Sequence, residues 1–404
     1  MANNNENKIL NVPNLRFPEF TGEWKKYRLD EMGESFIGLT YSPKDVVENE
    51  GTIVFRSSNI QNGQIDYSDI VRVSKTIKER IITRENDLLI CARNGSPRLI
   101  GKNALIKKTD ANNTFGAFMM VYRSIDNDFI HPLLSTRRYV SQVGENLGAR
   151  INQITTSDLN SFEFFFPKDD GEKRKIGKLF DLLNERIATQ NKIIDKLQSL
   201  ISGIIQNAIQ KGLNDNTWEM IYLSKLLTER KEKNSNGYEV NSVSVSEGVI
   251  NQIEYLGRSF AASDTSKYNV VRYGDIVYTK SPTGNFPYGI IKQSFQKHPV
   301  AVSPLYGVYE PYSNEAGCFL HYYFLSSIVT TNYLSPLIQK GAKNTINISN
   351  QTFLNNMVPY PKEEVGIRPI AELLRKVQIK LNIERLSLVL LEQQKTYLSQ
   401  SMFI

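Results

Sequence analysis

The sequence has few of the residues that support disulfide, thiolate or imidazole chemistry. Its 404 residues include only two cysteines, Cys91 and Cys318, and three histidines, His131, His298 and His321. Two cysteines cannot form a disulfide framework, and none of these side chains has the close spacing of metal ligands, so we expect no metal site. The separations are also too wide to indicate a Ser/His/Asp arrangement.

Long apolar runs are missing as well. The longest, such as Phe162–Pro167, are far shorter than the roughly 20 residues needed to span a bilayer, so we expect no membrane partner. Residues 1–11 lack the charged and then apolar pattern of a secretory leader. Together with the low cysteine content, this predicts a reducing, cytoplasmic environment.

Motifs for catalysis and cofactor binding are also lacking. There is no Asn-Pro-Pro-aromatic loop for amino methylation and no glycine-rich turn for a methyl donor, so we predict no cofactor. Gly95–Asn103 resembles a phosphate loop, but it has five residues between its glycines instead of four, and Asn103 replaces the Mg²⁺-binding Ser or Thr. Residues 167–173 lack nuclease spacing and fit a polar helix start better. We predict no catalytic residues in this chain.

Positive charge is present, and it is unevenly distributed. The net charge is +7, and residues 51–150 hold 15 Lys and Arg against 9 Asp and Glu. A basic block favours a polyanionic partner. An ordinary solvated surface explains the charge alone equally well.

The chain is long enough for two domains, and it repeats itself with a period of about 194 residues. Three pairs of segments frame the repeat: Trp24–Leu29 with Trp218–Leu223, Gly148–Ile154 with Gly341–Asn347, and Phe164–Pro167 with Val358–Pro361. Between them only fragments match, such as Asn86–Ile90 with Gly274–Tyr278. The long period indicates a duplicated domain, and the divergent interiors indicate two different readouts.

A long helix is predicted at the end of each half. Between Glu172 and Lys211 there is no proline, and apolar residues follow a heptad pattern. Its seams are Phe180, Ile187, Ile194, Ile201 and Ala208, with Ile176, Leu183, Leu197 and Ile204. The seams of the second helix are Leu374, Leu381, Leu388 and Met402, with Ile370, Val377, Leu391 and Leu398.

Polar residues interrupt these seams at equivalent positions, Gln190 and Glu384, and also at Lys395. Shared heptads with the same polar break favour pairing of the two helices over two separate core helices. Because each helix ends its half, the pair would be an antiparallel coiled coil, with Gln190 and Glu384 setting its register.

The globular parts combine predicted strands and helices. Short β-branched or aromatic runs predict strands at Ile53–Phe55, Asp87–Ala92, Met119–Tyr122 and Asp275–Thr279. Phe129–Gly144 and Phe319–Gln339 predict helices that Pro132 and Pro336 interrupt. The expected fold class is α+β, with two mixed α/β domains at 1–167 and 212–361. Long helices at 168–211 and 362–404 separate them in a pseudo-twofold repeat.

Polar loops suited to DNA follow two of the predicted strands. The turn after the first strand carries Arg93, Asn94, Ser96 and Arg98, with Lys102 beyond it. The turn in the second half carries Lys280, Ser281 and Asn285. A second group follows the paired glycines: Arg150, Asn152 and Gln153 in the first half, and Lys343 and Asn344 in the second. Arg pairs with guanine and Asn with adenine, and both bind phosphate. For any single residue, a solvated turn is an equally good explanation.

This frame resembles the specificity subunit of type I restriction-modification systems over essentially the whole chain. The resemblance rests on Phe17-Pro-Glu-Phe with Trp24, on Trp218, on the paired glycine segments, and on the two Pro-then-heptad endings. No short motif defines the family, whose signature is the order variable domain, helix, variable domain, helix. Pro369, just before the second set of heptads, departs from this pattern.

The resemblance implies two target-recognition domains that each read half of a split, asymmetric site in double-stranded DNA. The helices would act as a ruler, two methyltransferase subunits would dock, and restriction subunits would join the complex. About 30 heptad residues at ~1.5 Å each give ~45 Å, which at ~3.4 Å per base pair is on the order of 13 base pairs.

Two other classes of function compete with this one. A non-enzymatic scaffold would use the same coiled coil to join two protein-binding domains. A catalytic nuclease or methyltransferase is disfavoured because its motifs are missing. The target bases are not readable from the sequence, since recognition also depends on loop geometry and DNA shape.

Overall fold

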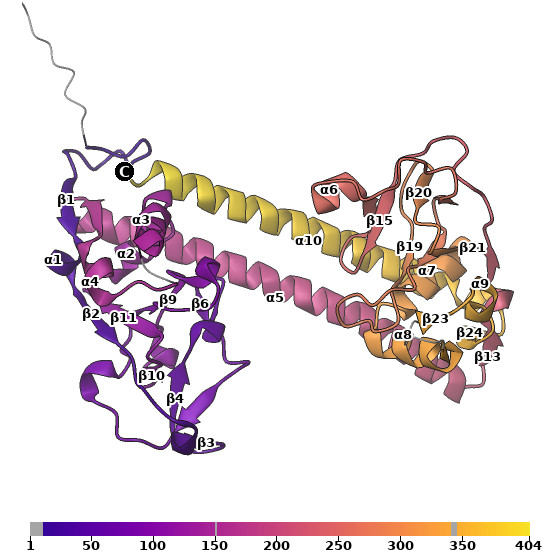
Figure 1. The fold of residues 1–404 in the computed structure, drawn as a ribbon, viewed down its shortest axis with the longest axis horizontal. Helices are drawn as coiled ribbons and strands as arrows, with labels where there is room; N and C mark the ends of the chain where they lie inside the picture. The colour runs from indigo at the N-terminus through magenta and orange to yellow at the C-terminus, as the bar shows by residue number, and fades with distance from the viewer. Residues whose placement is uncertain (1–10, 150–151, 341–345) are drawn as a thin grey trace, which may run out of the picture. The chain divides into compact units, whose positions relative to one another are not determined.

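The computed structural model describes residues 11–149, 152–340 and 346–404. It forms two compact units (Figure 1). Unit 1 combines residues 1–191 with residues 386–404, and unit 2 consists of residues 192–385. Each unit therefore contains one globular part of the chain and a portion of both long helices.

Unit 1 is built around a four-stranded antiparallel sheet. Its order is β2 (Glu34–Ile37), β11 (Met119–Arg123), β8 (Leu88–Cys91) and β9 (Asn103–Leu105). A second sheet has the order β10 (Thr114–Phe115), β4 (Thr52–Phe55), β7 (Val71–Val73) and β3 (Val46–Val47). Two strand pairs complete the unit: β1 (Lys25–Arg28) with β12 (Glu163–Phe166), and β5 (Ile60–Gln61) with β6 (Gln64–Ile65). The strands expected at 53–55, 87–92 and 119–122 are confirmed.

The helices of unit 1 pack on the central sheet. They are α1 (Leu29–Met32), α2 (Asn127–Leu133), α3 (Arg137–Ala149) and α4 (Thr156–Ser161). The prediction that Pro132 would interrupt the helix at Phe129–Gly144 was wrong in its detail, because Pro132 lies inside α2. The break follows Leu133, where Thr136 Oγ1 donates a hydrogen bond to the Leu133 carbonyl at 2.8 Å.

Unit 2 contains an antiparallel sheet with a comparable order. It runs β14 (Leu227–Glu229), β21 (Gly307–Pro311), β18 (Ile276–Tyr278) and β19 (Ile291–Gln293). The remaining strands form pairs: β13 (Trp218–Tyr222) with β24 (Met357–Pro361), β15 (Asn241–Ser244) with β16 (Gly248–Asn251), β17 (Asn269–Val271) with β20 (Val300–Val302), and β22 (Gln339–Lys340) with β23 (Ile346–Asn347). The strand expected at 275–279 is confirmed.

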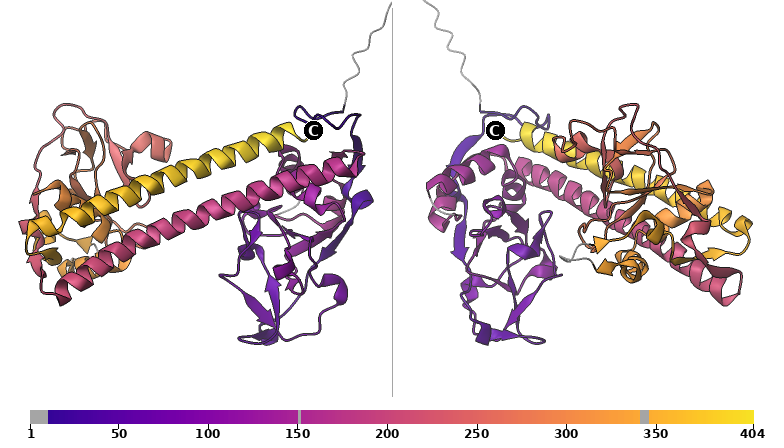
Figure 2. Two further views of the ribbon diagram at one scale, coloured as in Figure 1. Left: turned by 180° about the vertical axis from the view of Figure 1, so that it is seen from behind. Right: turned by 45° about the vertical axis from the view of Figure 1, so that its right-hand side comes forward.

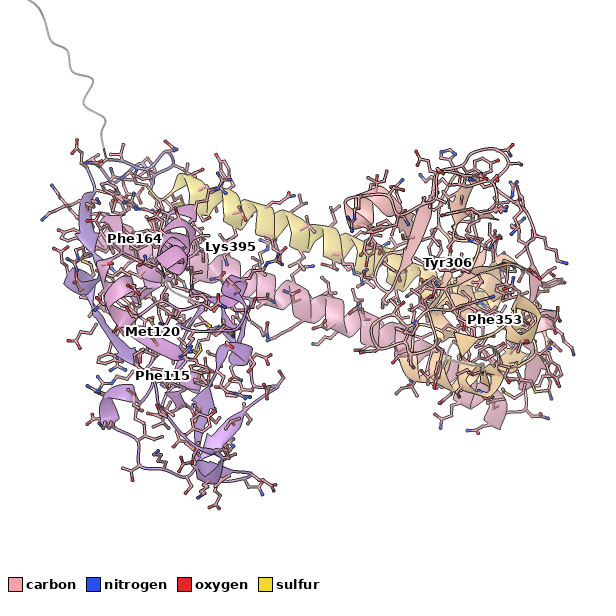
Figure 3. The ribbon with its side chains drawn as sticks, viewed as in Figure 1. Phe115, Met120, Phe164, Tyr306, Phe353 and Lys395 are labelled. Atoms are coloured by element: carbon pink, nitrogen blue, oxygen red, sulfur yellow. The ribbon has the colours of Figure 1, made fainter. Side chains whose placement is uncertain are left out.

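The helices of unit 2 are α6 (Gln252–Leu256), α7 (Asn314–Tyr323), α8 (Ser327–Leu334) and α9 (Asn350–Phe353). The helix expected at Phe319–Gln339 is therefore two helices, and Ser326 begins the second by accepting a hydrogen bond from the Val329 amide. Phe353 of α9, which is labelled in Figure 3, stacks on the rings of Tyr278 and Tyr309, with centroids 4.8 and 4.7 Å away. This aromatic stack anchors α9 to the central sheet.

A buried ion pair marks the beginning of the middle strand of unit 1. The Asp87 carboxylate accepts hydrogen bonds from Nε and NH2 of Arg123 at 2.7 and 2.6 Å, and from the Arg84 amide at 2.8 Å. Asn86 precedes it with a φ of 71°. Because Arg123 ends β11 and Asp87 precedes β8, the pair ties two neighbouring strands together.

Unit 2 has a similar buried carboxylate at the beginning of β18, but its arginine follows β14, which does not pair with β18. Asp275 accepts from Nε and NH2 of Arg230 at 2.7 and 3.0 Å, and from the Arg272 amide at 2.8 Å. Gly274 precedes it with a φ of 89°, which a residue without a side chain adopts at little cost. The fragment Asn86–Ile90 and its counterpart Gly274–Tyr278 thus have the same local structure.

The two long helices are α5 (Asp170–Asn214) and α10 (Arg368–Ser401), and both are drawn without interruption in Figure 2. Every predicted seam residue within them is buried or half-buried. Pro369 lies in the first turn of α10, where its missing amide hydrogen leaves no helical bond unmade. Gln190 is buried, and Glu384 forms an ion pair with Lys380 at 2.5 Å.

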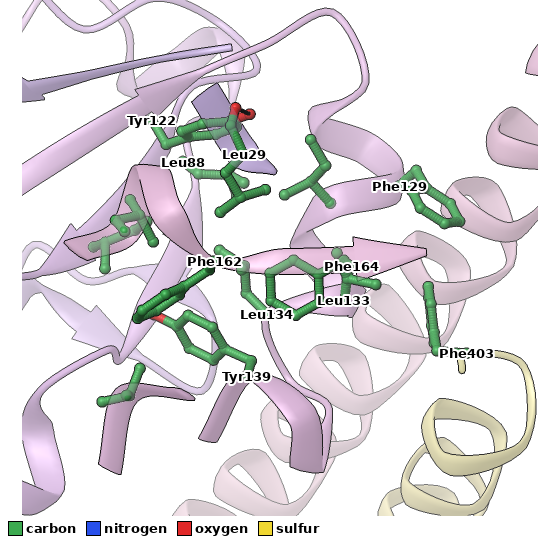
Figure 4. Packing of buried hydrophobic residues seen from close by; sticks show 14 of the residues in the cluster. Leu29, Leu88, Tyr122, Phe129, Leu133, Leu134, Tyr139, Phe162, Phe164 and Phe403 are labelled. Carbon is green, nitrogen blue, oxygen red and sulfur yellow. Dashed lines mark hydrogen bonds between the residues drawn. The ribbon is translucent and has the colours of Figure 1, made fainter. Parts of the chain in front are cut away.

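The end of α10 is part of the core of unit 1 (Figure 4). The ring of Phe403 lies 5.4 Å from that of Phe129, 5.7 Å from that of Phe180 and 6.4 Å from that of Trp24. The Leu15 amide also donates a hydrogen bond to the Ser401 carbonyl at 2.8 Å. The last residues of the chain therefore pack beside the beginning of α5. In the described part of the chain, no helix is both long and apolar enough to cross a membrane.

We expect Asp87→Ala to destabilise unit 1 by about 3–5 kcal/mol, because it leaves the Arg123 guanidinium unpaired at a largely buried position. Denaturant unfolding, followed by Trp24 fluorescence in a Trp218→Phe background, measures this loss. The matched control is Glu163→Gln, which removes an ion pair with Lys26 whose side chains are 44 % and 46 % exposed. That change should cost about 1 kcal/mol or less. Equal losses in both variants would contradict the expectation.

We expect the stability of unit 2 to fall as the pH drops below about 6.5, in part because of His321. Burial and nearby Lys292 lower the pKa of His321 to about 3, and its Nδ1 accepts the Gln293 amide at 3.1 Å. Below its pKa of about 6.5, the histidine of the unfolded chain binds a proton, whereas the buried histidine of the folded chain stays neutral. The free energy of unfolding therefore falls by up to ~1.4 kcal/mol per pH unit. His321→Asn should make the pH dependence shallower between pH 4 and 6. His298 is exposed, so His298→Asn should leave the pH dependence of stability unchanged. The same pH dependence in the wild type and in both variants would refute the assignment to His321.

Candidate nucleic-acid interface

The polar loop of unit 1 connects two neighbouring strands of the central sheet. It leaves β8 at Cys91, passes through a short 3₁₀ turn at Pro97–Leu99, and enters β9 at Asn103. Its base is fixed by Gly101, which has a φ of 81° and whose carbonyl accepts the Tyr139 hydroxyl at 2.9 Å. A β-carbon at Gly101 would lie 3.0 Å from that hydroxyl oxygen, so the close approach requires glycine.

The segment after α3 holds the same loop from the other side. The Ile154 amide donates to the Ala92 carbonyl at 2.9 Å, and the Asn94 amide donates to the Asn152 carbonyl at 3.3 Å. The side-chain amide of Asn152 donates to the Gly95 carbonyl at 3.2 Å. The two groups of polar residues expected from the sequence of the first half therefore meet in unit 1.

Asn94 is committed to the internal structure of this loop. Its Nδ2 donates to Ser57 Oγ at 2.9 Å, and its Oδ1 accepts the Ser96 amide at 3.0 Å. Ser96 and Lys102 are half-buried beside it. Asn94 thus positions the loop, and its carboxamide oxygen is already used.

The two arginines of the loop are exposed to solvent. The guanidinium of Arg93 lies over the ring of Phe118, with its central carbon 5.2 Å from the ring centroid. Within residues 11–149, 152–340 and 346–404, Arg98 has no hydrogen-bonding or ionic partner. These two cations are the groups of the loop that are available to an anionic ligand.

The matching loop of unit 2 is arranged differently. Lys280 has a φ of 56° and is half-buried, and its Nζ donates to Asn350 Oδ1 at 2.5 Å. Burial lowers the pKa of Lys280. Asn350 in turn donates to Glu229 at 2.7 Å, so Lys280 belongs to an internal network. No sequence pattern connects Lys280 with Asn350, because the two residues are 70 positions apart along the chain.

Two other predicted residues of unit 2 remain on its surface. Ser281 and Asn285 are exposed, and Asn285 lies in a turn closed by two mutual hydrogen bonds of 3.0 Å between Thr283 and Phe286. Arg150, Lys343 and Asn344 lie outside the described residues. The candidate interface of unit 2 thus rests on two polar side chains of the loop.

The structure also shows the state of the cysteines and of the two buried histidines. Cys91 and Cys318 are unpaired and buried, and burial raises the pKa of each thiol to about 11. Burial also lowers the pKa of His131 to about 4, with Lys395 and Lys107 contributing. His131 lies in α2 near its end. Among the described residues, no group of three or more His, Cys, Asp or Glu side chains is placed to hold a metal ion.

Part of the chain is similar in sequence to known proteins. Residues 21–199 match the sequence model of the type I restriction modification DNA specificity domain. The StySPI specificity subunit of Salmonella potsdam is 24% identical over 227 residues, which are 50% of this chain and 49% of that protein. The EcoKI specificity subunit of Escherichia coli (strain K12) is 24% identical over 185 residues, which are 44% of this chain and 39% of that protein. The chain spans about half the length of the curated relatives it matches, or less.

A solved structure agrees in fold. The S subunit of a type I restriction-modification system from M. genitalium superposes with a TM-score of 0.61 at 15% identity, covering 97% of this chain and 99% of that one. Its mixed α/β fold is the one described above. Residues 21–199 therefore match the DNA specificity domain of type I restriction-modification systems, and the fold of the chain is similar to that of a type I S subunit.

Proposed function

We propose that this chain gives a type I restriction-modification complex its DNA sequence specificity, and that it carries no catalytic residues of its own. Each unit reads one half of a split, asymmetric site in double-stranded DNA. The observation that carries the proposal is the loop of unit 1, where Arg93 and Arg98 are exposed on a backbone held by hydrogen bonds from residues 152–154. A pre-organised loop loses little conformational entropy when it binds, so its contacts contribute more to affinity.

The loop chemistry fits DNA better than a neutral ligand. Guanidinium groups bind phosphate and pair bidentately with the major-groove edge of guanine. Both arginines lie in the basic segment 51–150. In unit 2, Ser281 and Asn285 provide hydroxyl and carboxamide groups that suit a different set of bases. Different side chains on comparable sheets are what two different half-sites require.

The long helices would provide the spacing between the half-sites. Their seam residues are buried or half-buried, which supports an antiparallel coiled coil, and Gln190 and Glu384 would hold its register. The shared strand order and the similar turns before Asp87 and Asp275 support a pseudo-twofold repeat. Such a repeat would offer two similar positions for two methyltransferase subunits.

A second apolar face on α10 supports the docking of partner subunits. Outside the seams, this helix exposes Ile379, Ile383, Leu386, Leu390 and Tyr397. Residues spaced by three or four positions lie on one side of a helix, so these side chains form a stripe. An exposed apolar stripe of this kind marks an interaction surface. We assign it to the methyltransferase subunits, with restriction subunits joining the assembled complex.

The same stripe also fits the competing function, a scaffold that binds only proteins. The two functions differ in how binding responds to salt. Neutralising DNA phosphates releases counterions, so affinity for a duplex falls steeply as salt increases. The scaffold would be favoured if the chain and its methyltransferase do not bind a DNA duplex, or if their affinity for it does not change with salt.

The main test is to exchange one half of the chain. We expect replacement of residues 25–147 by the same segment of a relative to change one half of the methylated motif and leave the other half intact. The physical reason is that each unit has its own core and its own loops. Methylome sequencing of cells that express the chimera with its methyltransferase measures this. A change in both halves would contradict independent readout.

A sharper test concerns the free cation of the unit 1 loop. If Arg98 reads a base, Arg98→Ala should weaken binding by ~1–3 kcal/mol and relax specificity at one position. If it binds a phosphate, affinity should fall uniformly for all sequences, with a smaller salt dependence. Arg84, exposed before the opposite end of β8, provides the matched control, and Arg84→Ala should change neither property. Wild-type affinity and motif in Arg98→Ala would exclude this residue from the interface.

A further inference from the structure

Phe118 is an exposed aromatic residue beside the unit 1 loop. It lies in the turn before β11, and its side chain is 59 % exposed, while its neighbours in sequence Phe115 and Met119 are buried. Burial of an apolar side chain stabilises a fold, so the exposed ring contributes little to the core. Core packing therefore does not explain why a large apolar side chain lies at this position.

The backbone of Phe118 is fixed to the loop that carries Arg93. The Phe118 carbonyl accepts the amides of both Ala92 and Arg93 at 2.9 Å, and the Met119 amide closes the turn by donating to Gly116 at 2.8 Å. The loop is held in turn by Asn152, Ile154 and Ser57 as described above. The ring therefore projects from a rigid support.

The ring and the Arg93 guanidinium form one composite surface. The guanidinium lies over one face of the ring, with its central carbon 5.2 Å from the ring centroid, and the Phe118 side chain is still 59 % exposed. This contact limits the rotamers of Arg93 and keeps its N–H donors beside the ring. A ring that is covered on one face is poorly suited to insertion between two bases, since insertion uses both faces.

We propose that Phe118 is a specificity-determining residue of unit 1, and that its ring contacts the methyl group of a thymine in the major groove. Arg93 then pairs with a guanine next to that thymine. Both contacts are standard forms of readout in the major groove, an apolar side chain against the thymine methyl group and a bidentate arginine on guanine. The inference rests on the proposed function, and it adds that the half-site of unit 1 contains adjacent T and G.

The test removes the methyl group from the DNA. Methylome sequencing first defines the motif, and the half exchange assigns one half-site to unit 1. The purified complex of the chain with its methyltransferase is then titrated with duplexes in which each thymine of that half-site is replaced in turn by deoxyuridine. For the wild type, one replacement should weaken binding about fourfold, as expected for one buried methyl group.

The variants connect this effect to the ring. Phe118→Ala should bind the thymine and deoxyuridine duplexes equally, and Phe118→Leu should retain part of the difference. Ile125, 95 % exposed beyond the other end of β11, gives a matched control, and Ile125→Ala should keep the fourfold difference. Phe260 is 58 % exposed and lies under the Arg258 guanidinium in unit 2, so Phe260→Ala should also leave it unchanged.

Three results would overturn the inference. They are a unit 1 half-site without adjacent T and G, wild-type binding that no deoxyuridine replacement alters, and a Phe118→Ala variant that keeps the fourfold difference. Each of these is compatible with sequence-specific binding, so the proposed function would survive it. A complex that binds no DNA sequence selectively would instead remove the proposed function and this inference together.

Discussion

A buried carboxylate at the beginning of the middle strand fixes the register of the central sheet in unit 1. Asp87 is bound to Arg123 at the end of the neighbouring strand, and the pairing of Leu88 with Tyr122 follows from it. A shift by one residue would turn every side chain of β8 to the opposite face and leave the carboxylate without its partner. At the other end of the same two strands, this register brings the amides of Ala92 and Arg93 to the Phe118 carbonyl. The placement of the loop therefore depends on an ion pair at the far end of the sheet.

The elements that the sequence predicted well are those with a strong local pattern. The strands around residues 54, 90, 120 and 277 are short apolar runs, and both long helices have sustained heptads with few polar breaks, so each pattern strongly favours one type of element. The predictions at Phe129–Gly144 and Phe319–Gln339 failed in detail because local hydrogen bonds decided where those helices break. Thr136 closes the turn after Leu133, and Ser326 begins a new helix. Neither event leaves a clear signal in the apolar periodicity.

The candidate interface was predictable in composition but not in orientation. Arg93 and Arg98 are exposed, as a polar turn after a strand suggests. Lys280 has the same kind of position in sequence, yet its ammonium group is bound to Asn350, far along the chain. The exposure of Phe118 could not be predicted for a related reason. Whether an aromatic residue at a strand end faces the core or the solvent depends on the turn that precedes it, and that turn is set by contacts with a distant loop.

The contribution of the last residues to the core of unit 1 has a consequence for biosynthesis. Unit 2 is continuous in sequence, from residue 192 to residue 385, whereas unit 1 lacks Met402 and Phe403 until these residues have been synthesised. On the ribosome, the first unit to begin folding is thus the last to finish, because the aromatic partner of Trp24, Phe129 and Phe180 is synthesised more than 200 residues after each of them. A nascent chain that stops short of Phe403 can complete its second unit and still present an open core in its first. Proteases recognise such open cores, so this order of folding favours degradation of chains that stop before Phe403.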